Sequence, residues 1–444
     1  MSSEIEHRPY VLPAVIEPLV RRHAGDAAFY WAQHDSSAHS CRLDLARLLH
    51  FDRLLQAHLD GLEVAGATGW QLAFEELARW RGPGEVFVCA YLALAAGDGE
   101  RLREVWLQLQ LDPERGLRGL ISALAWVGTE QALPWVSHWL EASQNSALQV
   151  AALRTAALGG ATLLKTAQVA FEPQCQNEDA RVRAAAARLG ARLPRRLAQP
   201  VLLKLLEDVD PVVRAEAAIA LGGQEAAAPP VLWQVCAEWI GRCAELDGWD
   251  RFQAERRLAR WLRHLGGQLP PGHVALPRLL EQLPPRLGLL LALHHADPAH
   301  LPWVAAQMTA PETSRLAGWV WSALSGVQLE PAGLTLPPRL PDEETEQPVS
   351  LAVEDQDAGL PEPDPAAVQA WMAMHQASLP TWAPGLLGRA LTPDILQQML
   401  TGAPQALRWI AARRLGRPFF NNRAPALRQF ALLHKLSASA GASS

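Results

Sequence analysis

The chain has 444 residues, of which 49% are apolar and 19% are charged, and its formal net charge is −6. This composition excludes a disordered or collagen-like chain and is typical of a globular protein. The sequence has no uncharged apolar run of about 18 residues that could form a membrane helix, and residues 1–10 lack the basic and apolar regions of a signal peptide, so we expect a cytoplasmic protein without membrane insertion.

The acidic residues are unevenly distributed. Residues 340–388 contain nine acidic residues and no Lys or Arg, so the rest of the chain is close to neutral. A dedicated nucleic-acid-binding domain usually has a pI above about 9, and this chain has only three lysines. These features disfavour nucleic acid as the partner. The five cysteines are scattered, and no two of them have Cys-x-x-Cys spacing, which predicts reduced thiols.

The strongest pattern in the chain is an internal repeat of about 31 residues. Alanine-rich segments such as EVFVCAYLALAAG end on Gly66, Gly97, Gly128, Gly159, Gly190 and Gly222. The residue that follows a helix often adopts a left-handed conformation, which glycine takes without a Cβ clash. A second amphipathic segment lies between successive glycines. Two helices per repeat predict an all-α fold, an α-solenoid of helical hairpins that bury their apolar faces by stacking.

Two of the repeats carry a more specific motif. The segments DARVRAAAARLG (179–190) and DPVVRAEAAIALG (210–222) both contain an Asp, then Val-Arg, then alanines and Leu-Gly. They resemble HEAT repeats, specifically the short bacterial type that is also found in phycobilin-lyase-like proteins. The resemblance implies a structural ladder of ion pairs between repeats, formed by Asp179 with Arg183 and by Asp210 with Arg214.

The repeat pattern also predicts the domain organisation. The interval after Gly222 is about 13 residues too long, which indicates an insertion or lengthened helices, and the pattern resumes near Ala296 and Gly326. In chain order the expected parts are an N-terminal helical cap (1–50), a HEAT-like α-solenoid (51–330) with a Trp-rich insertion (229–265), an acidic Pro-rich linker (331–365), a C-terminal helical unit (366–436) and a disordered tail (437–444).

A second resemblance involves both ends of the chain. The segment Ala57-His58-Leu59-Asp60-Gly61-Leu62 and the C-terminal RPFFNNRAPALRQ accompany the HEAT-like array. Together they resemble an uncharacterised family of proteobacterial HEAT-repeat proteins that are often encoded beside type VI secretion genes. The resemblance implies a genomic context and supplies no catalytic residues.

The sequence contains none of the common catalytic motifs. Gly-rich phosphate-binding motifs, Gly-x-Ser-x-Gly and His-Glu-x-x-His are all absent, so we expect no enzyme, no cofactor and no metal. His34, Asp35, His39 and Cys41 lie close in sequence, but no helical spacing unites them, which favours a polar loop over a metal site.

Two further polar groups have structural interpretations. His294 and His295 precede Asp297, but adjacent residues on a helix point about 100° apart, so a role at a helix end is favoured over joint metal binding. His58 and Asp60 do not face each other on a helix, and we expect them to join Asp52 and Arg53 in a polar network that closes the first repeat.

These observations favour a non-catalytic scaffold that binds partner proteins. In HEAT-like arrays the glycine-ended helix of each hairpin lines the concave surface, and its positions 2, 6 and 9 before the glycine are expected to face away from the packed column. These positions give the candidate contacts Tyr91, Ser122, Trp126, Arg181, Arg188 and Glu216. The family resemblance implies an accessory or adaptor of type VI secretion that handles an effector, a spike or a chaperone component. The alternative is a HEAT-like enzyme, of the DNA glycosylase or lyase type, that uses the same groove.

Overall fold

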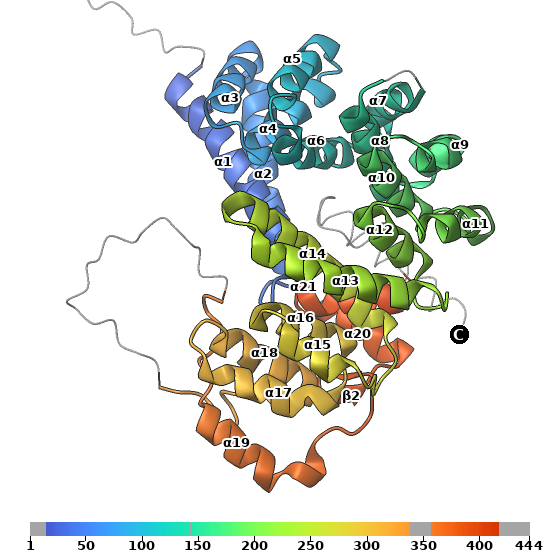
Figure 1. The fold of residues 1–444 in the computed structure, drawn as a ribbon. Coiled ribbons are helices and arrows are strands. Elements are labelled where there is room, and N and C mark those ends of the chain that lie inside the picture. The colour runs from blue at the N-terminus through green and yellow to red at the C-terminus, as the bar shows by residue number, and fades with distance from the viewer. Residues whose placement is uncertain (1–14, 142–143, 338–356, 417–444) are drawn as a thin grey trace, which may run out of the picture. The chain divides into compact units, whose positions relative to one another are not determined.

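Helices dominate the part of the chain that the computed structural model describes, which is residues 15–141, 144–337 and 357–416. These residues form 21 α-helices, four short 3-10 helices and one two-stranded antiparallel sheet (Figure 1). The prediction of an all-α fold is confirmed. No helix within these ranges combines the length and the apolar character that crossing a membrane requires.

The chain divides into two compact units. Among the described residues, the N-terminal unit contains residues 15–38 and 45–169, and the C-terminal unit contains residues 39–44 and 170–416. The short stretch at residues 39–44 therefore belongs to the unit that is formed by the second part of the chain.

Helices of the N-terminal unit alternate as the 31-residue repeat predicts. They are α1 (Glu17–Ser36), α2 (Leu45–Val64), α3 (Gly66–Trp80), α4 (Pro83–Ala95), α5 (Gly99–Leu109), α6 (Pro113–Val127), α7 (Thr129–Glu141), α8 (Ser146–Leu158) and the start of α9 (Ala161–Cys175), with the 3-10 helix η1 (Ser37–His39) after α1. The glycine-ended helices α4, α6 and α8 pack against one another in succession, and α1 packs against α2, α3 and α4. The alanine-rich faces supply this packing, since Ala90, Ala123 and Ala151 are completely buried.

The C-terminal unit continues the same arrangement over a longer stretch of chain. It contains α10 (Ala180–Gly190), α11 (Arg195–Leu205), α12 (Pro211–Leu221), α13 (Ala228–Glu245), α14 (Gly248–Gln268), α15 (Leu276–Gln282), α16 (Pro285–His295), η2 (Pro298–His300), α17 (Leu301–Ala306), η3 (Gln307–Thr309) and α18 (Ser314–Ser325). The helices α10, α12, α14, α16 and α18 pack in succession, as Figure 1 shows. The sequence predicts an insertion or lengthened helices in the Trp-rich region, and the structure shows two long helices, because α13 and α14 have 18 and 21 residues.

Four of the six repeat glycines have positive φ, but Gly128 and Gly222 combine it with ψ of −178° and 177° and so differ from the predicted left-handed helical conformation. The φ angles are 59° at Gly66, 66° at Gly97, 107° at Gly128 and 73° at Gly222. The prediction is wrong at Gly159, which follows α8 in an extended conformation, and at Gly190, which is the last residue of α10. In both of these repeats the chain leaves the helix without a left-handed residue at that position. The predicted ends near Ala296 and Gly326 are confirmed, because both residues have positive φ directly after a helix.

The described ends of the predicted acidic linker (331–365) are part of the C-terminal unit. Leu334 and Leu360 are buried, and the Leu336 N–H donates to the Glu362 carbonyl oxygen at 2.9 Å. Most of the predicted linker, residues 338–356, lies outside the described residues. The chain then forms α19 (Pro365–Met374), η4 (Gln376–Ser378), β1 (Gly385–Leu386), β2 (Arg389–Ala390), α20 (Pro393–Gly402) and α21 (Gln405–Arg414). The predicted tail at 437–444 and the motif RPFFNNRAPALRQ also lie outside the described residues.

Candidate functional site

Three of the predicted partner contacts lie in the N-terminal unit, and all three are buried. Tyr91, Ser122 and Trp126 are each less than a tenth exposed. Gln56 of α2 links two of them, because its amide donates to the Tyr91 hydroxyl at 3.2 Å and accepts from the Trp126 indole N–H at 3.3 Å. The expectation that these positions face outward is wrong, because α1 and α2 cover α4 and contribute residues that contact Trp126.

The other three predicted contacts lie in the C-terminal unit and differ in exposure. Arg181 is exposed and forms an ion pair with Asp179 at 2.7 Å. Arg188 keeps 27% of its side chain exposed, whereas Glu216 is completely buried. The outward orientation is therefore wrong for Glu216 as well. Partner binding by Arg181 and Arg188 stays a prediction.

An ion-pair ladder does connect successive repeats, but its acidic members differ from those that the resemblance implied. Arg183 donates two hydrogen bonds to Asp208, at 2.7 and 2.9 Å, and Arg214 pairs with Glu238 at 2.9 Å. Asp179 and Asp210 instead cap the N-termini of α10 and α12, where their carboxylates accept backbone N–H groups.

A helix-capping role for Asp210 predicts that its Ala and Asn variants differ in their free energy of unfolding. We expect Asp210→Ala to lower the free energy of unfolding by about 1 kcal/mol, because the N–H groups of Val212 and Val213 lose their acceptor. Asp210→Asn keeps an acceptor oxygen and is expected to change stability by only a few tenths of a kcal/mol. Urea denaturation of both variants measures the difference. An Asn variant as unstable as the Ala variant would show that the charge of Asp210 matters more than its cap.

Glu216 is the acceptor for side chains from two other helices. Arg188 of α10 donates to it at 2.8 Å, and Arg260 and Trp261 of α14 also donate to it. Burial alone would raise the pKa of the Glu216 carboxyl, but the charges and hydrogen bonds of the two arginines lower it to about 2. Glu216 is therefore an anion at neutral pH, and it joins α10, α12 and α14.

Further arginines lie where α14 and α21 meet. We call Arg260, Arg263, Arg413 and Arg414 the arginine cluster. The Arg413 guanidinium donates to the Arg263 carbonyl oxygen at 2.9 Å, and Arg414 donates to the His295 carbonyl oxygen at 3.3 Å. All four side chains are partly buried and keep some solvent exposure.

Trp409 of α21 lies beside the arginine cluster. The Arg413 guanidinium lies 5.5 Å from the centre of its ring, and the imidazoles of His264 and His294 contact its edge or face at ring-centre distances of 5.1 and 4.9 Å. Burial lowers the pKa of both imidazoles well below the usual range, and the positive charges of the neighbouring arginines lower it further. These two histidines are therefore neutral at pH 7 and add no charge to the cluster.

The cluster carries more positive than negative charge. Burial and the charge of Arg260 lower the pKa of Arg263 to about 9, and burial with the charges of Arg414 and Arg260 lowers the pKa of Arg413 to about 9. Both guanidiniums still carry their charge at pH 7. Within the described ranges, no carboxylate pairs with Arg263, Arg413 or Arg414, and the Nε atoms of Arg263 and Arg414 are buried without an acceptor. Such a group of guanidiniums is suited to bind an anionic ligand, because planar N–H pairs match carboxylate geometry.

Sequence reasoning missed the arginine cluster, although two local signals point to it. Arg260 and Arg263 have the i, i+3 spacing of one helix face, and Arg413-Arg414 form an adjacent pair at the end of α21. The contact between these segments spans 150 residues of sequence. No local pattern predicts such a contact.

The other polar groups considered from the sequence have separate structural roles. His34 and Asp35 lie on α1 and not in a loop, where His34 pairs with the buried Asp52 and Asp35 pairs with Arg118 at 2.5 Å. The expected network around His58 does not form as a unit, because His58 contacts His23 at 2.9 Å and Asp60 accepts from Gln56 at 2.8 Å. Among the described residues, neither the His34 group nor the His58 group brings three metal-ligating side chains together.

Comparison with known proteins supports the repeat assignment. Residues 170–238 match the family model of HEAT repeats. The matched stretch contains the two segments, 179–190 and 210–222, that carry the HEAT-like motif, so HEAT repeats are confirmed for this part of the chain. No curated protein matches the sequence. HEAT repeats commonly serve as protein-interaction scaffolds.

Proposed function

We propose that the chain is a non-catalytic HEAT-repeat scaffold that binds an acidic segment of a partner protein at the arginine cluster. The observation that supports this proposal is the gathering of Arg263, Arg413 and Arg414 without a carboxylate among the described residues. Guanidiniums that lie close together repel one another, and a bound carboxylate would replace this repulsion with attraction. The partner would therefore gain most of its affinity from charge-assisted hydrogen bonds.

An acidic peptide fits this surface better than a nucleic acid does. Four arginines of α10 and α11 do not extend the cluster into a cationic stripe, because each forms an ion pair with an acidic side chain; they are Arg181, Arg183, Arg188 and Arg195. Nucleic-acid affinity depends on many phosphate contacts that release counterions. A peptide with two or three carboxylates can be bound by the cluster alone.

The proposal is tested with a fluorescently labelled peptide that contains several Asp and Glu residues and with the full-length protein. We expect Arg413→Gln and Arg263→Gln each to weaken peptide binding about tenfold in a fluorescence polarisation titration, because each removes one charged donor. The matched control is Arg278→Gln on α15, which removes an exposed arginine of the same unit. It should leave the affinity unchanged.

Two outcomes would contradict the proposal. One is equal affinity for the peptide in wild type and in both cluster variants, with circular dichroism showing that all three are folded. The other is tighter binding of a single-stranded oligonucleotide than of the peptide, lost in the same variants, which would favour the nucleic-acid alternative.

A finer proposal concerns the biological partner. The resemblance of residues 57–62 to the family encoded beside type VI secretion genes supports an accessory or adaptor that handles an effector, a spike or a chaperone component of that system. Affinity purification from the native host, followed by mass spectrometry, is expected to recover such a component with wild type and to lose it with Arg413→Gln. Recovery of other proteins alone would contradict the secretion role while leaving the acidic-peptide proposal to its own test.

A further inference from the structure

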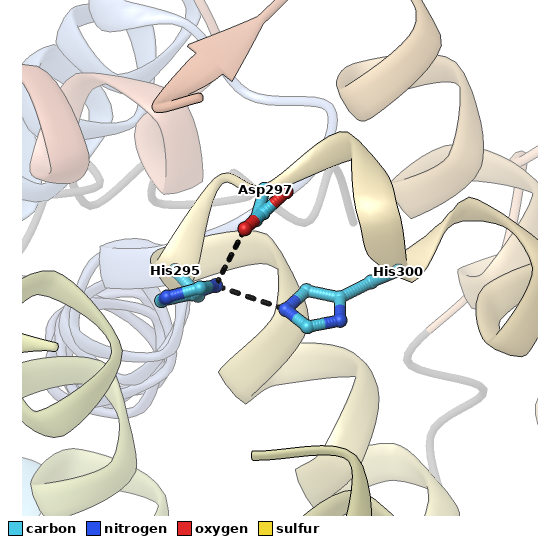
Figure 2. Close-up of side chains that lie close together, drawn as sticks. All are labelled: His295, Asp297 and His300. Carbon is cyan, nitrogen blue, oxygen red and sulfur yellow. Dashed lines mark hydrogen bonds and ion pairs between the residues drawn. The ribbon is translucent and has the colours of Figure 1, made fainter. Parts of the chain in front are cut away.

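Two histidines and one aspartate come together where α16 ends. His295 is the last residue of α16, Asp297 precedes the 3-10 helix η2, and His300 is the last residue of η2. Ala296 between them has a left-handed conformation, with φ of 59°, which turns the chain back so that η2 faces the end of α16 (Figure 2). All three side chains are buried, and one donor atom of each lies within 4.8 Å of the others.

Backbone groups of a neighbouring loop orient two of these side chains. His295 Nε2 lies 2.9 Å from the Pro270 carbonyl oxygen, so this nitrogen carries the proton and donates to the carbonyl. His295 Nδ1 is therefore the nitrogen with the lone pair, and it faces His300 and Asp297. The Asp297 carboxylate accepts the N–H of Gly272 at 2.8 Å and the N–H of Ala299 at 2.9 Å. Imidazoles that donate to a carbonyl and carboxylates that accept backbone N–H groups are typical of metal ligands and their surroundings.

The distances between the donor atoms fit a small divalent ion. His295 Nδ1 lies 2.9 Å from His300 Nε2 and 4.0 Å from Asp297 Oδ2. Zinc bonds of about 2.0–2.1 Å in tetrahedral geometry place two ligand atoms about 3.3 Å apart. The three ligand atoms lie within 4.8 Å of one another, so side-chain shifts of roughly 1 Å would bring them to the spacing that zinc requires. The ion would replace the proton that His300 now donates to His295.

We propose that His295, Asp297 and His300 form a zinc site that joins the end of α16 to η2. Two imidazoles and one carboxylate favour zinc over calcium or magnesium, which prefer oxygen ligands. Three protein ligands leave a fourth position for water. The site lies at the C-terminus of α16, where the helix dipole favours a positive charge. Through Pro270 and Gly272 it also stabilises the loop between α14 and α15.

Metal analysis of the full-length protein tests this proposal. The protein is treated with EDTA, dialysed against micromolar zinc chloride and desalted, and its zinc content is measured by inductively coupled plasma mass spectrometry. We expect one zinc ion per chain in wild type, and at least about tenfold weaker binding in His300→Ala and Asp297→Asn. Asp297→Asn is informative because asparagine keeps an oxygen that caps η2, so this variant folds without the charged ligand. Cobalt in place of zinc should give visible absorption bands in wild type that both variants lack.

The control separates this site from surface histidines. His375→Ala removes an exposed imidazole that stacks on Trp371, and it should retain the zinc content of wild type. The proposal is overturned if folded wild type takes up no stoichiometric zinc, or if both ligand variants take up as much zinc as wild type. It is also overturned if His375→Ala loses as much zinc as His300→Ala.

Discussion

A Glu216→Gln variant unfolds at a lower urea concentration than wild type, with an expected loss of about 3 kcal/mol in the free energy of unfolding. The carboxylate is completely buried, and it is the acceptor for Arg188 and Arg260, which keep only 27% and 31% of their side chains exposed. Glutamine has a similar shape but no charge, so it leaves both guanidiniums partly buried without their anion. Denaturation followed by circular dichroism measures the effect.

The matched control for Glu216 is Glu238, a glutamate of the same unit that also forms an ion pair between successive repeats. Glu238 pairs with Arg214 at 2.9 Å, but 45% of its side chain is exposed. Glu238→Gln is therefore expected to cost less than about 1 kcal/mol, because water screens exposed pairs. Equal losses in the two variants would show that burial of Glu216 adds nothing to its ion pairs.

The depressed pKa of Glu216 predicts how this contribution depends on pH. Because the pKa falls from 4.5 to about 2 on folding, the carboxylate contributes its full stability above pH 4.5 and loses it as the pH falls toward 2. The stability difference between wild type and Glu216→Gln should shrink over this acid range and be constant from pH 5 to 8. A difference that grows on acidification would contradict the assignment of Glu216 as an anion.

A Gly119→Ala variant is expected to lose about 3 kcal/mol in the free energy of unfolding, because the new methyl group overpacks a helix crossing. A Cβ atom at Gly119 of α6 would lie inside the contact distance of the Pro83 carbonyl oxygen and 2.9 Å from the Phe87 nitrogen. Both atoms belong to the backbone of α4, so no side-chain rotation relieves the clash, and the two helices must move apart.

The control for Gly119 is a glycine that sits in another helix of the same unit. Gly25 of α1 is exposed, and a Cβ atom there would meet no atom within 4 Å. Gly25→Ala should therefore stabilise the protein by up to about 1 kcal/mol, through the higher helix propensity of alanine. Urea denaturation is expected to show a lower free energy of unfolding for Gly119→Ala and a higher one for Gly25→Ala. Stabilisation in both would mean that α4 and α6 do not approach so closely.

Local patterns in the sequence predicted the helices well. Each glycine-ended segment is a helix, and the lengthened interval after Gly222 corresponds to the long helices α13 and α14. The N-capping roles of Asp179 and Asp210 were not predicted, because the resemblance assigned both residues to the ion-pair ladder. The helices could be predicted because helix periodicity depends on neighbours within a few residues.

Side-chain partners could not be predicted in the same way. Trp126 and Glu216 were expected to face outward, but Trp126 is covered by residues of α1 and α2, and Glu216 by residues of α14. A periodic pattern shows which face of a helix is apolar and does not show which other helix covers the remaining faces. For the same reason, the sequence pointed to His294 with His295, whereas the structure places His300 beside His295. That pairing depends on the left-handed turn at Ala296.

The ion pairs between successive repeats have a consequence for how the C-terminal unit unfolds. Arg183 with Asp208, Arg188 with Glu216 and Arg214 with Glu238 each connect a hairpin to its successor. In a linear array the coupling between adjacent elements decides whether they melt one at a time or together. Since opening α10 would break its bonds to Asp208 and Glu216 at once, fraying should not stop after a single hairpin. The region from α10 to α14 is therefore expected to exchange its amide hydrogens as one cooperative block.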